Sequence, residues 1–241
     1  SVMWATCEPK AQSEVAAALQ SFIADVSASA TSAEGSSHLI SLSPLHIGQG
    51  SAVTTKEHPM PIDTSFVGLA IPNDIQSALD PRQQALRAAA QLLKNEYLHQ
   101  VIREEGGAYG ASAASTVNGD LGGVTLSSYR DPTPEKTVAS LSRTASVLGD
   151  TAYVTQQRLD EAKLRLFSQL DSPVSADTFG QSEFLYGASN TLRQQAREML
   201  LNVSCADVVS AATLFAVTPN SVFAIVKPEP AKAAPEQPSS Q

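Results

Sequence analysis

The chain has 241 residues, of which 42% are hydrophobic, so it can bury a core within one large domain or two small ones. Sixteen basic residues against 24 acidic ones give a formal net charge of −8, which repels phosphate backbones and excludes a nucleic-acid partner. No run of about 18 or more apolar residues occurs, so no membrane-spanning segment and no membrane partner are predicted. The sequence starts without Met on strand-like residues, and we therefore expect it to be a piece of a longer polypeptide.

The first third of the chain alternates between regular patterns and small polar residues. Residues 1–7 predict a strand, and residues 13–26 predict an amphipathic helix because their apolar positions recur on one helical face. The Ser/Ala/Thr-rich stretch 27–37 predicts a flexible connection, and no regular element is assigned to residues 39–55. Residues 64–71 form a near-continuous apolar run before a Pro-Asn pair, which is typical of a central strand.

The longest periodic pattern is a helix that starts at Asp80 and Pro81. Asp80 is suited to accept from the free N–H groups of the first turn, and Pro81 fits the first helical position. Apolar residues keep helical spacing up to Arg103 at Leu86, Ala90, Leu93, Tyr97 and Val101. Gly106 and Gly107 end this helix, since glycine adopts the left-handed conformation that closes helices. The pair 104–105 is Glu-Glu at the negative end of the helix dipole, which predicts a non-local reason for these carboxylates.

A hairpin follows the two glycines. Residues 109–117 and 121–129 are extended segments around Asn118-Gly119, the strongest short-range hairpin signal, and Asp120 leaves room for a bulge. Another helix opens at Asp131-Pro132 or at Thr133-Pro134 and carries a stripe made of Val138, Leu141, Ala145 and Leu148.

The last third is mostly helical. Helices are predicted from near residue 155 and over residues 191–202, with residues 171–190 only partly helical. A third helix starts at a capping box formed by Ser204 and Asp207. Residues 222–226 predict the final strand, and the Pro/Ala/Glu/Gln/Ser-rich stretch 228–241 predicts a disordered tail. The expected fold class is α+β, with one domain over residues 1–227 and a sheet that cannot be purely parallel because it contains the hairpin.

The residues give no complete catalytic apparatus. The four histidines, His38, His46, His58 and His99, are scattered, and none stands at zinc-helix spacing from another. Cys7 and Cys205 are too few for a disulfide framework and are expected to be small buried side chains. No Gly-x-Ser-x-Gly elbow occurs, and the glycines at 106–107 follow a helix, which is the reverse of the dinucleotide-binding context.

Two hydrogen-bond donors flank these glycines. Arg103 carries a guanidinium and Tyr109 a phenol, and donors placed around a peptide carbonyl stabilise the oxyanion that forms on it. The alternative from spacing alone is that Arg103 pairs with a carboxylate at the helix end while Tyr109 packs in a strand.

Two motifs in this order resemble a known family. The run Leu-His-Gln-Val-Ile-Arg-Glu-Glu-Gly-Gly-Ala-Tyr-Gly at 98–110, followed by Ser-Tyr-Arg-Asp-Pro at 128–132, is similar to the C-terminal domain of pitrilysin-family metallopeptidases (inverzincins), in the presequence protease and falcilysin-like branch. The close similarity covers about residues 86 to 142. It implies a mixed, largely antiparallel sheet packed against several helices.

The resemblance also implies a function. Such enzymes are clam-shells of two halves that degrade unfolded peptides in a closed chamber, and their zinc motif His-x-x-Glu-His lies in the first domain. That motif is absent here, so we expect zinc ligands in the missing N-terminal half and no metal bound by this chain. By the resemblance Arg103 and Tyr109 are the catalytic and substrate-holding donors, and Gly106 and Gly107 form the turn that places them.

The remaining expectations concern partners and location. The N-terminal half of the same polypeptide and unfolded peptides are the implied partners, the acidic balance suits basic peptides, and a mitochondrial or other organellar lumen is suggested. In the second motif Asp131 is expected to cap a helix and Arg130 to pair locally. Two alternatives stay open, namely a non-catalytic subunit of the processing-peptidase or respiratory-complex core type, and an unrelated anion-binding module.

Overall fold

The computed structural model describes residues 7–31, 52–118, 121–176 and 178–229. These fall into two compact units, the smaller with residues 1–46 and 170–195 and the larger with the rest. In the smaller unit η1 spans Pro9–Ala11, α1 spans Gln12–Thr31 and α6 spans Gln181–Tyr186. The predicted helix is thus present but longer, and the prediction of a flexible stretch from residue 27 is wrong up to Thr31, because alanine is a strong helix former.

The larger unit is built on a five-stranded sheet with the order β1-β5-β2-β4-β3. Its strands are β1 (Thr54–Met60), β2 (Ser65–Asn73), β3 (Gly110–Asn118), β4 (Leu121–Asp131) and β5 (Val222–Pro228). Only β1 and β5 pair in parallel, and the other three pairings are antiparallel. The predicted fold class is confirmed, and β2 is central as its apolar run predicted. The polar strand β1 was missed because its sequence has no alternation of apolar residues.

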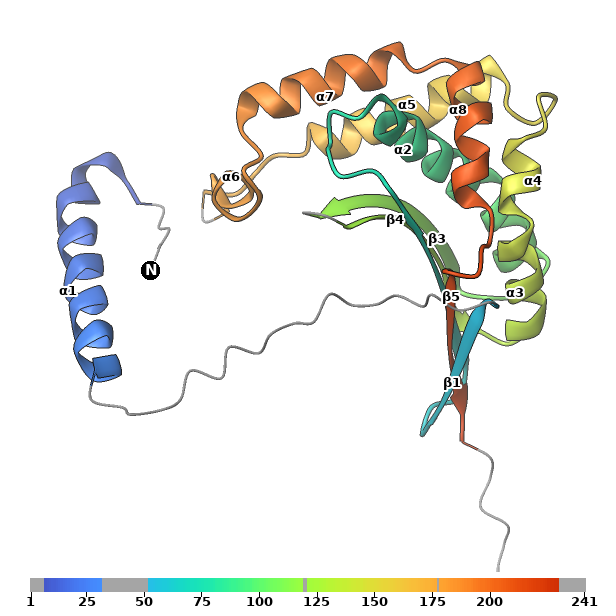
Figure 1. Cartoon of the computed structure of the whole chain (residues 1–241), viewed down its shortest axis with the longest axis horizontal. Coiled ribbons are helices and arrows are strands. Elements are labelled where there is room, and N and C mark those ends of the chain that lie inside the picture. Colours follow the sequence, from blue (N-terminus) through green and yellow to red (C-terminus); the bar gives the residue numbers. More distant parts are fainter. Residues whose placement is uncertain (1–6, 32–51, 119–120, 177, 230–241) are drawn as a thin grey trace, which may run out of the picture. The chain divides into compact units, whose positions relative to one another are not determined.

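The two faces of this sheet differ. Val67, Leu69 and Ile71 of β2 are buried and point to the face on which the helices of this unit lie (Figure 1). The intervening residues, such as Phe66 and Gly68, point to the opposite face, which no described helix of this unit covers. The core therefore lies between the sheet and its single layer of helices.

The helices of the larger unit follow the predicted pattern. They are α2 (Pro81–Leu93), η2 (Lys94–Glu104), α3 (Pro134–Ser142), α4 (Thr144–Leu148), α5 (Gln156–Leu170), the end of α7 (Asn190–Asn202), α8 (Cys205–Ala211) and η3 (Ala212–Phe215). Leu86, Leu141 and Leu148 are fully buried, as the helical periodicity predicted, and so are Leu159 and Phe215. The predicted stripe after the hairpin is divided between α3 and α4, and its helix opens at Pro134, the second of the two expected starts.

The structure shows the hydrogen bonds of two predicted helix N-caps. The Asp80 carboxylate accepts from the Arg82 N–H at 2.9 Å, with Pro81 at the first helical position. Ser204 and Asp207 form the predicted capping box at the start of α8. These side chains satisfy N–H groups that have no partner inside the helix.

Some of the predictions cannot be compared with the structure, and the prediction for the cysteines is wrong. The opening strand up to residue 6, residues 32–51, the bulge at Asp120 and the tail from residue 230 lie outside the described residues. Both cysteines were expected to be buried, but Cys7 is exposed and Cys205 is half-buried. No single described helix is long and apolar enough to cross a membrane, and the pair α7 and α8–η3 meets that criterion only jointly, with a bend of 102° between them.

Candidate functional site

The helix that carries Arg103 changes its hydrogen bonding part-way along. The segment η2 continues α2 as a wider π-helix, and the Glu105 N–H at its end donates to the Gln100 carbonyl, five residues back, at 3.0 Å. The Tyr153 hydroxyl supports this segment by accepting from the Tyr97 N–H at 3.1 Å, and burial raises the pKa of Tyr153 to about 12. π-Helical segments occur frequently at functional sites. Arg103 therefore lies on the last turn of an unusual, side-chain-supported helix.

The two glycines end this helix for different steric reasons. Gly107 has φ +77°, a conformation that a residue with a side chain adopts only with strain. A Cβ on Gly106 would lie 2.6 Å from the Ile102 carbonyl oxygen, closer than real contacts allow. The Gly107 N–H donates to the Arg103 carbonyl and the Ala108 N–H to the Ile102 carbonyl, which closes the turn. The prediction that Gly106 and Gly107 end the helix is confirmed.

The second motif holds this turn from β4. Buried Asp131 accepts from the Ser128 hydroxyl at 2.6 Å and from the Thr133 N–H at 2.8 Å. The Thr133 hydroxyl in turn donates to the Gly106 carbonyl at 3.1 Å. The prediction that Asp131 caps a helix is wrong, because Thr133 is the residue before α3 and Asp131 instead fixes the loop that contacts the glycine turn.

Arg103 reaches a cavity on one side of the turn. This cavity has a volume of about 390 Å³ and is lined by Lys94, Asn95, His99 and Arg103 of η2, by Gly110 and Ala111 of β3, and by Arg165 of α5. β3 is the edge strand among the described strands of the sheet. Arg103, an exposed residue, therefore lines a cavity beside the first residues of an edge strand.

Tyr109 has different neighbours. Its ring is 66% exposed and packs edge-on against Tyr129 at 5.6 Å between centroids, and Tyr129 packs in the same way on Phe66 at 5.4 Å. The Arg130 guanidinium carbon lies 6.0 Å from the Tyr109 centroid and 5.6 Å from that of Tyr129. Arg130 was expected to pair locally, and its described contacts are with these two rings. The Tyr109 ring is held by β4, while its hydroxyl has no hydrogen-bond partner within the described residues.

Arg103 and Tyr109 are connected through the backbone of the glycine turn and not through contacts between their side chains. The Tyr109 N–H donates to the carbonyls of Tyr129 and Arg130 at 3.0 and 3.3 Å, so the chain passes from the glycine turn directly into the sheet. Arg103 lines its cavity with Gly110, the residue after Tyr109. Arg103 and Tyr109 thus lie on either side of one rigid turn, and no direct contact links their side chains within the described residues.

The two acidic residues at the end of η2 have local partners. Glu104 Oε1 lies 3.3 Å from His99 Nδ1, and Glu105 Oε1 accepts from Gln100 Nε2 at 3.0 Å. Glu105 also lines a polar cavity of about 740 Å³ together with Lys136 and Arg143. The unfavourable helix-dipole position of these carboxylates is therefore offset by hydrogen-bond donors and cations around it.

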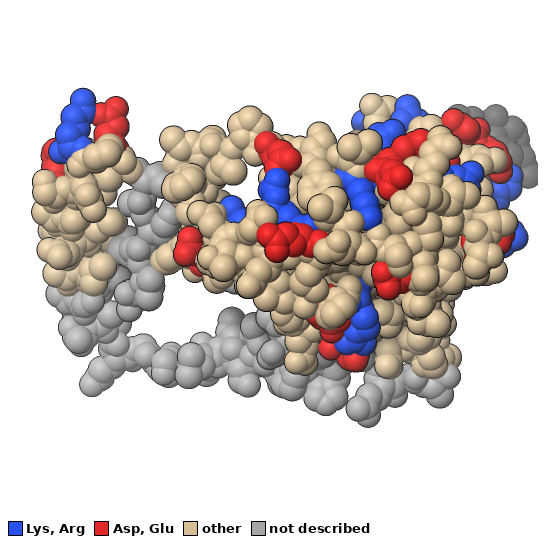
Figure 2. Space-filling view, turned by 90° about the horizontal axis from the view of Figure 1, so that it is seen from above, with Lys and Arg blue, Asp and Glu red and all other residues tan. Residues whose placement is uncertain are grey.

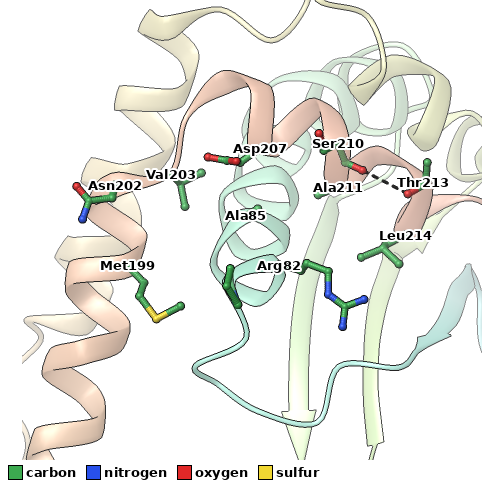
Figure 3. A pocket seen from close by; sticks show the side chains of 11 residues that line it. Arg82, Ala85, Met199, Asn202, Val203, Asp207, Ser210, Ala211, Thr213 and Leu214 are labelled. Carbon is green, nitrogen blue, oxygen red and sulfur yellow. Dashed lines mark hydrogen bonds between the residues drawn. The ribbon is translucent and has the colours of Figure 1, made fainter.

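A more apolar cavity of about 570 Å³ lies between α2, α7 and α8. Figure 3 shows Met199 on one side, Leu214 on the other and Ala85 between them. Its charged groups are engaged, because Arg82 pairs with Asp74 at 2.9 Å and Asp80 at 2.7 Å, and this raises the pKa of Arg82. Nothing in this lining provides a free reacting group.

The part of the chain that the structure describes offers no zinc site. Among the described residues, no three His, Cys, Asp or Glu side chains gather closely enough to hold a metal ion. His38 and His46 lie outside the described ranges, His58 lies on β1, and His99 faces Glu104.

Comparison with known proteins identifies the family. A family model described as "PreP C-terminal domain" matches residues 71–227. The chain belongs to this family, and it is thereby a C-terminal domain of a pitrilysin-family protease. It is 33% identical over 213 residues to the mitochondrial presequence protease of Aspergillus fumigatus, a match that covers 88% of this chain and 19% of that protein. It is 42% identical over 125 residues to the mitochondrial presequence protease of Mus musculus, covering 52% of this chain and 12% of that protein.

The chain thus spans about a fifth or less of the length of these curated relatives. Solved structures agree with the PreP C-terminal domain in fold. A protease from Helicobacter pylori matches 75% of this chain and 45% of its own with a TM-score of 0.62 at 17% identity. The inactive peptidase domain of a putative zinc protease from Bordetella parapertussis matches 73% of this chain and 99% of its own with a TM-score of 0.58 at 17% identity.

Proposed function

We propose that this chain is the non-zinc C-terminal domain of a zinc metalloendopeptidase that degrades unfolded peptides, and that it supplies Arg103 and Tyr109 to the substrate. The observation that supports the proposal is the turn at Gly106 and Gly107, with Arg103 on the last turn of η2 before it and Tyr109 directly before β3 after it. The family membership and the names of the relatives, which are presequence proteases, support the reaction class.

The proposed role of the two donors is electrostatic. The Arg103 guanidinium and the Tyr109 hydroxyl donate to the carbonyl oxygen of the peptide bond under attack and hold the substrate backbone before that. Hydrogen bonds from donors that are already in place stabilise the transition state more than the ground state, because the negative charge on this oxygen grows during the reaction. The network from Asp131 to the Gly106 carbonyl keeps the turn fixed during this change.

The edge strand gives the substrate a place to lie. β3 is the terminal strand of the described sheet, and an extended peptide running beside it meets Arg103 at the cavity and Tyr109 at the start of the strand. An extended backbone is available only in an unfolded peptide. The proposed substrates are therefore short unfolded peptides such as presequences, enclosed with the rest of the polypeptide in a chamber.

The remaining parts of the proposal lie outside this chain. Zinc is held by the preceding half of the polypeptide, since the described residues do not fit it. That half is also the proposed partner of this domain. On the names of the relatives we propose a mitochondrial location, which subcellular fractionation with an antibody to this domain tests directly.

Turnover by the complete protein tests the assigned roles. Arg103→Ala and Tyr109→Phe are each expected to lower kcat by about 100-fold or more, the loss typical of an oxyanion donor. Arg143→Ala is the matched control for Arg103, because it removes another exposed arginine from a different cavity. Tyr129→Phe is the control for Tyr109, since it removes a phenol oxygen from the same ring cluster. Turnover by either test variant within about twofold of the wild type would show that the residue does not have this role.

A further inference from the structure

The wall of the cavity beside Arg103 is unusually basic for this chain. It contains Lys94, Arg103, Arg165 and His99 and no Asp or Glu, although the chain has a net charge of −8. In Figure 2, basic and acidic side chains are interspersed over the visible surface. A cavity with basic residues and no acidic residue in its lining is thus a local departure from the net charge of the chain.

The cations of this wall are unpaired. Within the described parts of the chain, the side chains of Lys94, Arg103 and Arg165 make no hydrogen bond and no ion pair. His99 alone faces a carboxylate, that of Glu104, which does not line the cavity. Elsewhere in this domain cations do find partners, as Arg82 and Lys227 do with two carboxylates each. Three neighbouring cations without a counter-charge repel one another, and a bound anion removes that repulsion.

The three cations of the cavity can only donate hydrogen bonds. Lysine and arginine have no acceptor atom. The Asn95 Oδ1 atom already accepts from Gln91 Nε2 at 3.0 Å, which leaves the two amide N–H groups of Asn95 free. A wall of donors matches a ligand that only accepts, and an ionised carboxylate is such a ligand.

From this we propose that the cavity lined by Lys94 and Arg165 binds a carboxylate of the peptide substrate, either its C-terminal carboxylate or an acidic side chain. The inference rests on the proposed function, because the cavity includes Arg103 and adjoins the start of β3. A Cβ on Gly110 would have no neighbour within 4 Å, so this side of the cavity is open to an entering chain. Lys94 and Arg165 are then residues that determine specificity, and they act on substrate affinity.

A carboxylate site beside Arg103 changes the expectation drawn from the net charge of the chain. The acidic balance suggested basic peptides, but the surface beside the proposed reacting carbonyl selects a negative group. The two preferences are compatible, because a basic peptide still ends in a carboxylate. Substrate position would then be fixed by one ionic contact close to the site of cleavage.

The test uses the complete protein and a set of matched peptides. A cleavable peptide is compared with its C-terminal amide and with a version in which each Glu or Asp is replaced by Gln or Asn. The double variant Lys94→Gln/Arg165→Gln is expected to raise KM about tenfold for peptides that keep the recognised carboxylate, with kcat little changed. The same variant is expected to leave KM unchanged for the peptide that lacks that carboxylate. The peptide that escapes the effect identifies the source as the C-terminal carboxylate or a side chain.

The control is Lys136→Gln/Arg143→Gln, which removes the same two charges from the neighbouring polar cavity. It is expected to change KM for all the peptides by the same small factor. The proposal is overturned if Lys94→Gln/Arg165→Gln has no effect on KM, or if it raises KM equally for peptides with and without a carboxylate. These results are separate from the kcat of Arg103→Ala, so failure of the carboxylate site and failure of the proposed function can be told apart.

Discussion

Asp131 is the residue whose loss should most weaken the glycine turn. The residue is 1% exposed, and its carboxylate accepts two short hydrogen bonds, from Ser128 Oγ at 2.6 Å and from the Thr133 N–H at 2.8 Å. Hydrogen bonds to a charged group contribute about 1.5 kcal/mol or more each, and a buried donor left without a partner adds a further cost. Asp131→Ala is therefore expected to lower the free energy of unfolding by about 3 kcal/mol.

A graded series separates the two bonds. Asp131→Asn keeps an acceptor for the Thr133 N–H but faces the Ser128 hydroxyl with a donor, so it is expected to cost about 1 kcal/mol. The Ser128 hydroxyl also accepts from the Val67 N–H at 3.3 Å, and Ser128→Ala is expected to fall between these two values. The measurement is urea unfolding followed by circular dichroism. A loss below about 1 kcal/mol for Asp131→Ala, or a larger loss for Asp131→Asn, would refute this reasoning.

Three further predictions concern the turn, a helix start and the metal. Gly107→Ala is expected to lower the free energy of unfolding by about 1–2 kcal/mol, because Gly107 has a positive φ. Gly110→Ala is the control and is expected to change the free energy of unfolding by less than about 0.5 kcal/mol, because a Cβ at Gly110 would enter open space. Equal losses in the two variants would contradict the conformational explanation. Hydrogen bonds lower the pKa of Asp207, the larger effect coming from the Ser204 side chain and the smaller from the Ser204 N–H. The stabilisation of the folded state by these bonds is therefore complete above the ordinary Asp pKa of about 4. It is lost as the pH falls through the lowered pKa. Ser204→Ala is therefore expected to destabilise by about 1 kcal/mol at pH 7, and urea unfolding at about pH 3 should show a smaller difference; an unchanged difference would exclude the carboxylate as its cause. The isolated chain is expected to bind no stoichiometric zinc and to cleave no peptide, and metal analysis or a peptide assay with a positive result would contradict this.

The sequence predicts the elements around the site better than their internal geometry. The helix from Asp80, its end at Gly106 and Gly107, and the hairpin follow from caps, turn residues and apolar spacing. The π-helical hydrogen bonding of η2 could not be predicted, because its 11 residues keep apolar positions that also suit an ordinary helix. The Tyr97 N–H of this segment donates to the hydroxyl of Tyr153, which is 56 residues away in sequence, and no local pattern predicts such a contact.

The residues of the candidate site also divide into those that local sequence predicts and those that only the folded structure brings together. Arg103 and Tyr109 were predicted because they flank the glycines and match a family motif, and their roles stay a prediction. Lys94 and Arg165 were not predicted, since one lies mid-helix and the other, on α5, meets the rest of the cavity lining only in the folded chain. Asp131 was found but misassigned, because Asp-Pro and Thr-Pro in succession are both ordinary helix starts and only the structure shows which of them is used.

The most direct test of the central claim is a double-mutant cycle of Arg103→Ala and Tyr109→Phe in the complete protein, with kcat as the measured quantity. If both residues donate to the same oxyanion, each single variant should lose about 100-fold or more, and the double variant should lose much less than the product of the two single losses. A single variant with nearly wild-type kcat, or losses that multiply fully in the double variant, would contradict a shared role in the reaction.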